Sequence, residues 1–180
     1  MKTKKPIKEL FFDYPTKQWH FQQLLKEAGL SRAQTNAWLK KLLKEGLVRR
    51  IKPRGRMPYH IAKYNSADYI NAKKIFALEK FHASGFLQHL SSLKHAKAVI
   101  IFGSMARGDW YKESDIDLFV YGNADELELG KYWLKLGREI QFFGCENKQE
   151  LKKYSPALLK NILTGYTIKG SLPVEVKASA

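Results

Sequence analysis

The stretch that begins with residues 98–102 restricts the possible folds more than any other part of the chain. These residues form an unbroken apolar run that predicts a buried strand, and Gly103-Ser104 interrupts it where the chain must turn tightly. A short helix beginning at Ser104 would place its free N–H groups and the serine hydroxyl above the strand end, as in backbone phosphate sites. We therefore predict an anion-binding corner at Gly103 and Ser104.

Two carboxylates follow at the start of a second apolar segment. Asp115 and Asp117 alternate with Ile116, Leu118 and Val120. Side chains two residues apart on a strand share one face, so the pattern predicts both carboxylates on one face and the aliphatic side chains in the core. Mg²⁺ binds through one or two carboxylates together with substrate phosphates. Each half of the pattern alone is commonly an ordinary turn or cap, whereas the two halves together favour a metal-nucleotide site.

The joined pattern, Gly103-Ser104 followed by Ser114-Asp115-Ile116-Asp117-Leu118, resembles the signature of the DNA polymerase β-like nucleotidyltransferase superfamily. It is most similar to the small prokaryotic branch, the minimal nucleotidyltransferases, and covers roughly residues 95–180. The resemblance implies a mixed sheet with flanking helices and Mg²⁺-dependent transfer of a nucleotidyl group from a nucleoside triphosphate. The resemblance also implies that the acceptor is a hydroxyl, on a protein tyrosine, an RNA end or an antibiotic.

The resemblance also assigns roles to individual residues. Asp115 and Asp117 would hold Mg²⁺ and be catalytic, and Gly103, Ser104 and Ser114 would bind the nucleotide. Arg107 either contacts a phosphate or forms an ion pair with Asp109, and the sequence leaves both interpretations open.

A third acidic residue belongs, in the superfamily, on the strand after the next helix. The sequence predicts a helix over 124–136 that ends at Gly137, then a strand over 138–143. Glu139 is the acid there, so the resemblance makes it a third metal ligand that orients a second metal or deprotonates the attacking hydroxyl. The alternative is a surface ion pair with Arg138. The buried side of the predicted helix comprises Leu127, Leu129, Tyr132, Trp133 and Leu136.

The positive charge is concentrated in the first third of the chain. Residues 1–66 hold 16 Lys and Arg against 4 Asp and Glu, whereas residues 67–180 hold 16 against 13. This asymmetry indicates two modules, of which the first meets a polyanion. Helices are predicted over 7–14, from an N-cap at Thr16 to Gly29, and over 32–45 after Ser31, followed by strands at 47–51 and 59–62.

Two helices joined by a glycine-containing turn and followed by a basic hairpin resemble the winged helix-turn-helix fold. Cations on a helix often only solvate its outer face, but five cations in one hairpin repel one another unless an anionic partner is present. We therefore expect double-stranded DNA to bind this module. The candidate DNA-binding residues are Arg32, Gln34, Asn36 and Lys40 on the helix and Arg49, Arg50, Lys52, Arg54 and Arg56 in the hairpin.

These patterns predict an α+β chain with a winged helix-turn-helix domain over 1–65, a helical linker over 66–94 and a small mixed-sheet nucleotidyltransferase domain over 95–180. The linker is apolar enough to pack against one module or to pair with its copy in a homodimer. The single cysteine excludes an internal disulfide, and no histidine or cysteine spacing suggests zinc. No apolar run indicates a membrane span or secretion signal, so we expect a cytoplasmic protein.

A non-catalytic interpretation stays open beside the enzymatic one. The chain would then be a DNA-binding transcriptional regulator, or the antitoxin of a toxin-antitoxin pair, whose second module senses nucleotide or docks a partner. Relatives of this size often act beside an all-helical HEPN protein, so the resemblance makes such a partner plausible. The nucleotide, the acceptor and the DNA sequence are not specified by any residue.

Overall fold

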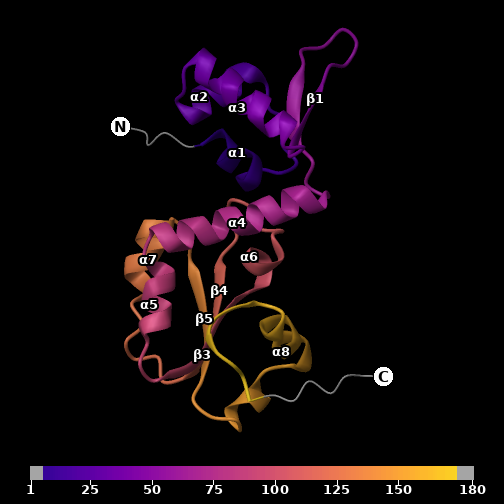
Figure 1. Ribbon diagram of the computed structural model, residues 1–180. Coiled ribbons are helices and arrows are strands. Elements are labelled where there is room, and N and C mark those ends of the chain that lie inside the picture. The colour runs from indigo at the N-terminus through magenta and orange to yellow at the C-terminus, as the bar shows by residue number, and fades with distance from the viewer. Residues whose placement is uncertain (1–5, 174–180) are drawn as a thin grey trace. The chain divides into compact units, whose positions relative to one another are not determined.

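The computed structural model describes residues 6–173 and divides into two compact units, which Figure 1 presents as a ribbon. The first unit extends to Ile75 and also includes Asp109–Glu113. The second unit contains Phe76–Gly108 and the chain from Ser114 onward. The division falls inside α4 (Ala67–Ala83), the helix that the sequence marks as a linker.

The first unit contains three helices followed by an antiparallel hairpin. The helices are α1 (Ile7–Asp13), α2 (Phe21–Ala28) and α3 (Arg32–Lys44), and the hairpin strands are β1 (Val48–Ile51) and β2 (Tyr59–Ala62). Helix α3 begins where its sequence predicts, because Ser31 and Gln34 satisfy each other's backbone N–H groups in a capping box. Thr35, Leu39 and Leu42 form its buried side.

The N-cap of α2 is not the residue that the sequence predicts. Thr16 does not cap this helix; His20 occupies the cap position. The cause is a long-range pairing, because Trp19 and His60 exchange two backbone hydrogen bonds of 2.8 Å and hold the chain extended until His20. A cap prediction from local sequence cannot include this pairing with the second hairpin strand.

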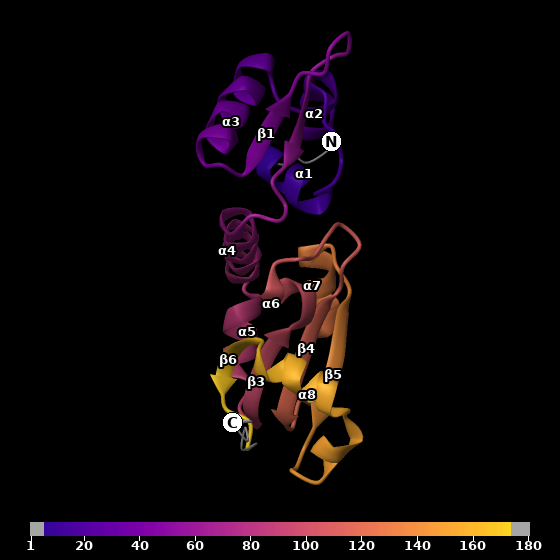
Figure 2. The same cartoon turned by 90° about the vertical axis from the view of Figure 1, so that its right-hand side faces the viewer.

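The second unit is built on a mixed sheet in the order β5-β4-β3-β6, in which β4 and β5 are parallel and the other neighbours antiparallel. Figure 2 shows β3, β4 and β5 beside one another. The observed mixture of helices and a mixed sheet agrees with the predicted fold class for this part of the chain. The elements are α5 (Phe86–Ser92), β3 (Ala96–Phe102), α6 (Gly103–Arg107), β4 (Ile116–Gly122), α7 (Leu129–Leu136), β5 (Ile140–Cys145), the 3₁₀ helix η1 (Glu150–Lys153), α8 (Pro156–Leu163) and β6 (Tyr166–Gly170).

The central strand β3 is covered on both faces, which explains its unbroken apolar run. Ile100 and Phe102 belong to the core cluster that includes Ile162 of α8. The alternate residues Val99 and Ile101 are equally buried, and in Figure 1 the helices α5 and α7 lie on the side opposite α8. A central strand buried on both faces has no polar alternation.

Two elements of this unit begin later than the sequence suggests. Helix α7 starts at Leu129, not near residue 124, because Asn123 Oδ1 accepts the Asp125 N–H at 2.9 Å in a turn that competes with helix formation. Of its apolar side chains, Tyr132 is buried but Trp133 is 53% exposed. Strand β5 starts at Ile140, after Glu139. Across residues 6–173, no helix combines the length and apolarity needed to cross a membrane.

Candidate active site

The strand ends of β3 and β4 bring the two halves of the sequence pattern together. Phe102 pairs with Asp117 in the antiparallel register, so Gly103 follows immediately beside the Asp117 carboxylate. A Cβ atom placed on Gly103 would lie 1.8 Å from Asp117 Oδ2. Gly103 also has a φ of +68°, a conformation that side-chain-bearing residues rarely adopt. Glycine is therefore required at this corner because the carboxylate occupies the space of a side chain.

The two aspartates form an electrostatically coupled pair. Asp115 immediately precedes β4 and is exposed, whereas Asp117 is the second residue of β4 and is half-buried. Burial raises the pKa of Asp117, the charge of Asp115 raises it further, and Arg107 opposes the shift. Two carboxylates on one strand edge match the oxygen donors that Mg²⁺ takes from proteins, and a cation would relieve their repulsion. These residues thus fit a magnesium ion.

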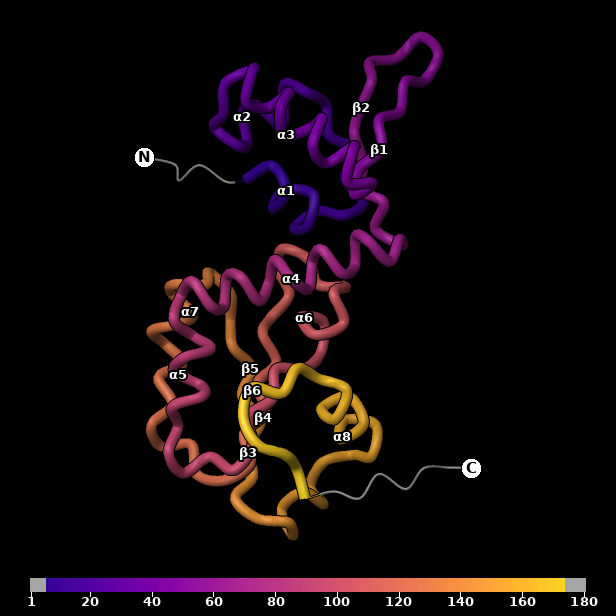
Figure 3. Tube along the Cα trace, in the orientation of Figure 1, coloured from indigo at the N-terminus to yellow at the C-terminus, as the bar shows by residue number. Residues whose placement is uncertain are grey.

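Helix α6 forms the short turn that the sequence predicts after the glycine, and Figure 3 traces the chain from β3 through it. Ser104 is half-buried, and its carbonyl accepts the Gly108 N–H at 2.9 Å, which ends the helix. Arg107 is exposed and donates from Nη1 to Asn161 Oδ1 at 3.1 Å. Its guanidinium lies close enough to Asp117 to influence that carboxyl, so Arg107 belongs to the rim of the aspartate pair.

The segment before β5 fixes the backbone that carries the aspartates. Arg138 donates from Nη1 to the Ser114 carbonyl at 2.8 Å, and the Ile116 N–H donates to the Glu139 carbonyl at 2.9 Å. Sequence reasoning considered Arg138 only as an ion-pair partner of Glu139 and missed its hydrogen bond to the entry of β4. No local pattern reveals this contact, because it joins residues 24 positions apart.

Glu139 is exposed and lies just outside β5. In the parallel register Ile116 pairs with Ile140 and Asp117 with Gln141. Gln141, whose side chain is an amide, is therefore the residue of β5 that pairs with Asp117. Glu139 lies two residues before Gln141, so it is on the same face of the sheet. Among residues 6–173, no three His, Cys, Asp or Glu side chains are arranged to hold a metal ion together.

The predicted DNA-contacting side chains all lie on the surface of the first unit. Two of those on α3 have contacts within this unit: Gln34 Oε1 accepts the Ser31 N–H at 3.0 Å, and the Arg32 guanidinium lies 5.5 Å from the Phe21 ring. The remaining positions are open to solvent. These exposed residues are Asn36 and Lys40 on α3 and Arg49, Arg50, Lys52, Arg54 and Arg56 in the hairpin.

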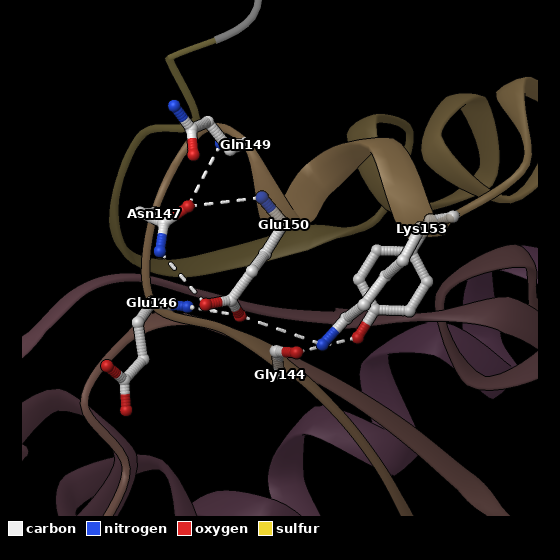
Figure 4. Close-up of polar contacts among 7 residues, drawn as sticks. Gly144, Glu146, Asn147, Gln149, Glu150 and Lys153 are labelled. Atoms are coloured by element: carbon white, nitrogen blue, oxygen red, sulfur yellow. Dashed lines mark hydrogen bonds and ion pairs between the residues drawn. The ribbon is translucent and has the colours of Figure 1, made fainter.

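A second polar cluster lies after β5, at the sheet end opposite the aspartates (Figure 4). The Glu150 carboxylate accepts hydrogen bonds from the Glu146 N–H at 3.2 Å and from Asn147 Nδ2 at 2.9 Å, and lies 3.8 Å from Lys153 Nζ. A cavity of about 410 Å³ adjoins this cluster. Because Glu150 is engaged in closing the loop, the aspartate pair is the better candidate site.

Comparison with protein families gives an independent indication. The family model described as "Nucleotidyltransferase domain" matches residues 83–172, which is half of the chain. The match includes Gly103, both aspartates and the segment that precedes β5. A search of curated proteins found no matching relative. The chain therefore belongs to the nucleotidyltransferase domain family.

Proposed function

We propose that the protein transfers a nucleotidyl group from a nucleoside triphosphate to a hydroxyl on a protein or RNA, in a Mg²⁺-dependent reaction coupled to DNA binding. The observation that supports this most directly is the Asp117 carboxylate lying against Gly103. That contact places a charged, half-buried acid beside the corner whose backbone is suited to phosphate. Family membership supports nucleotidyl transfer in general.

The second unit would supply the binding and positioning groups. Asp115 and Asp117 would hold Mg²⁺, which neutralises triphosphate charge when bound. Gly103 and Ser104 would bind phosphate oxygens, with Arg107 and Ser114 at the edge of the nucleotide. This division of roles accounts for the required glycine and for the coupling between the aspartates.

Glu139 would complete the reaction as the third acid. Its carboxylate would take the proton of the attacking hydroxyl, whose oxygen bonds to the α-phosphorus while the bond to pyrophosphate breaks. Its exposed position outside β5 leaves it free to meet an acceptor that arrives from solvent. Most of the rate enhancement would come from positioning and charge neutralisation.

The first unit would bind duplex DNA as a winged helix-turn-helix, with α3 as the recognition helix and the β1–β2 hairpin as the wing. The exposed cations on both elements support this role. Neutralising phosphates releases counterions, so the affinity should fall steeply with salt. Binding that is insensitive to salt would contradict the proposal.

A regulator without turnover is the second candidate. The observation in its favour is the register that places Gln141, and not an acid, beside Asp117. Such a protein would bind nucleotide and DNA, form a homodimer or dock a helical HEPN-type partner, and act as an antitoxin. Transfer assays separate it from the enzyme.

The deciding experiment presents each of the four α-labelled nucleoside triphosphates with Mg²⁺ to candidate protein and RNA acceptors. Under the enzymatic proposal, label reaches an acceptor and is lost in Asp115→Asn. Glu139→Gln should lower transfer at least about a hundredfold while keeping most nucleotide affinity. Glu146→Gln is the matched control, because Glu146 is also exposed and lies beyond the other end of β5.

Two outcomes would contradict parts of this proposal. If Glu139→Gln transfers the nucleotidyl group as fast as the wild type, Glu139 has no catalytic role. Nucleotide and DNA binding without any labelled acceptor would favour the regulator.

A further inference from the structure

The loop that joins the two halves of the nucleotide motif is held by the first unit. Residues 109–113 lie between the end of α6 and Ser114, which precedes Asp115. They belong to the same compact unit as the chain up to Ile75, although the residues on both sides belong to the second unit. The loop is thus part of the candidate active site by sequence and part of the candidate DNA-binding unit by packing.

Trp110 anchors this loop in an aromatic cluster. Its side chain is 2% exposed and meets the Phe12 ring edge-to-face, with 6.0 Å between the ring centroids. Phe12 in turn packs edge-to-face on Tyr69 of α4 at 5.2 Å. The Tyr69 hydroxyl donates to the Phe11 carbonyl at 2.6 Å. Burying a tryptophan removes a large apolar area from water, so this cluster resists displacement of the loop.

Two hydrogen bonds hold the backbone of the same loop. The Lys73 ammonium donates to the Trp110 carbonyl and lies 4.3 Å from the centroid of the Trp110 ring. The Lys112 N–H donates to the Asp13 carbonyl at 2.9 Å. Lys73 is only 1% exposed, and an apolar side chain in its place would avoid the cost of burying a charge but could not donate to the carbonyl. The buried lysine therefore fixes the backbone of the loop as well as its side chain.

Helix α1 connects the anchored loop with the candidate recognition helix. Phe12 and Asp13, the last two residues of α1, are buried and contact the loop. The same helix packs against α2 and α3. Protein interiors are close-packed, so a helix enclosed in this way transmits a displacement instead of absorbing it. The position of the loop therefore depends on that of α3.

The connections from the anchors to the candidate site are short. Only two residues separate the end of α6 from Trp110, and only two separate Lys112 from Asp115. Consecutive Cα atoms are about 3.8 Å apart, so neither connection can take up a large shift of its anchor. A movement of the anchored loop is thus passed to both the phosphate corner and the aspartates.

We propose that Trp110 and Lys73 are positioning residues through which the DNA-binding unit controls the nucleotide site; this inference rests on the proposed function. DNA bound along α3 restricts the motion of α1 and of the anchored loop. Mg²⁺-nucleotide then binds a site whose two halves are already fixed, and less conformational entropy is lost. DNA therefore raises the affinity for Mg²⁺-nucleotide, and by linkage the nucleotide raises the affinity for DNA by the same factor.

The test measures both affinities on the full-length protein at one fixed concentration of salt and Mg²⁺. The nucleotide probes are the four nucleoside triphosphates with a methylene bridge between the α and β phosphorus atoms, which cannot be cleaved there. Calorimetry gives their affinity with and without a saturating duplex of mixed sequence, and fluorescence anisotropy gives the affinity for the duplex with and without the tightest-binding probe. We expect each ligand to tighten the other at least about fivefold, by equal factors.

Substitutions in the loop identify the residues responsible. Trp110→Ala should lower the coupling to less than about twofold while the duplex alone binds as it does to the wild type. Trp110→Phe should keep most of the coupling, because a phenyl ring still packs on Phe12 and the backbone carbonyl still accepts from Lys73. Tyr111→Ala is the matched control, since Tyr111 is the adjacent aromatic residue and is 55% exposed. A purely structural role of Trp110 would lower the stability in urea unfolding and leave the coupling factor unchanged.

An insertion tests the connections without changing the anchor, and it decides the question even if Trp110→Ala does not fold. A short glycine segment after Gly108 and another after Glu113 make both connections flexible and leave the contacts of Trp110 and Lys73 in place. Each ligand alone should bind within about threefold of its wild-type affinity, and the coupling should disappear.

Several results would overturn the inference. Nucleotide and duplex that both bind, but do not tighten each other, would show that the DNA-binding unit does not control the nucleotide site. Full coupling in the insertion variant would show that the loop does not carry it, and unequal factors would show that the effect is not linkage between two sites. By contrast, a wild-type protein that fails to bind nucleotide or duplex would refute the proposed function itself, and with it this inference.

Discussion

Replacing Gly103 by alanine tests the geometry of the proposed site most directly. The added Cβ would lie 1.8 Å from Asp117 Oδ2 and 2.8 Å from Asp117 Cγ. An ordinary contact begins at 3.4 Å, so the carboxylate has to withdraw by the difference of about 1.6 Å. A displacement of about 1 Å in a catalytic group commonly lowers the rate about a hundredfold.

The stability change should be much smaller than the functional one. Asp117 is a short side chain that can rotate away, so the backbone need not move. The remaining penalty is that of a side chain at a φ of +68°, about 1–2 kcal/mol. We therefore expect Gly103→Ala to fold, to unfold at slightly lower urea concentration, and to lose Mg²⁺-dependent nucleotide binding and transfer.

Gly85→Ala supplies the matched control within the same unit. Gly85 has a φ of +79°, and a Cβ atom there would meet nothing within 4 Å. It should show a similar stability loss in urea unfolding and unchanged nucleotide binding in calorimetry. Gly103→Ala that transfers the nucleotidyl group within about threefold of the wild-type rate would refute the reasoning, because the misplacement argument predicts a rate loss of about a hundredfold.

Two titratable groups give further predictions. Asp117→Asn should stabilise the metal-free protein by about 0.5–2 kcal/mol in urea unfolding, because it removes a charge that burial and Asp115 disfavour, while abolishing Mg²⁺-dependent nucleotide binding. Burial, followed by the charge of Arg50, lowers the pKa of His60. As the pH falls below about 6.5, the unfolded chain therefore takes up a proton at this histidine before the folded chain does. The free energy of unfolding should decrease as the pH falls through this range. His60→Gln should flatten this decrease, and an unchanged pH slope in that variant would assign the effect to other groups.

The sequence predicted most elements because their signals are local. Ser31 and Gln34 form a complete capping box, and Gly29 and Gly137 end helices in the left-handed conformation that glycine favours. The alternation of polar and apolar residues around Asp115 and Asp117 predicts the start of β4 to within one residue. Signals of this kind depend on neighbours along the chain and need no tertiary information.

The remaining features depend on contacts between distant residues. Trp110 is 2% exposed and packs edge-to-face on Phe12 at 6.0 Å, and Lys73 lies over its ring at 4.3 Å and donates to its carbonyl. This explains why residues 109–113 belong to the first unit although the nucleotidyltransferase motif surrounds them. A loop this short has no sequence periodicity from which such packing could be predicted. The Arg138 hydrogen bond to Ser114 was missed for the same reason.

The aspartate pair is energetically unfavourable in the absence of a cation, and this has a bearing on function. Asp117 is partly removed from water, lies beside a like charge and is held against a glycine in a constrained conformation. A fold selected for stability alone would place an amide or an apolar residue there, since relieving such a site commonly stabilises a protein. Arg107 offsets only part of the combined effect of burial and of Asp115, because the pKa of Asp117 is raised despite it. A bound divalent cation with its nucleotide would convert this repulsion into binding energy, and a nucleotidyltransferase needs its acids arranged in this way.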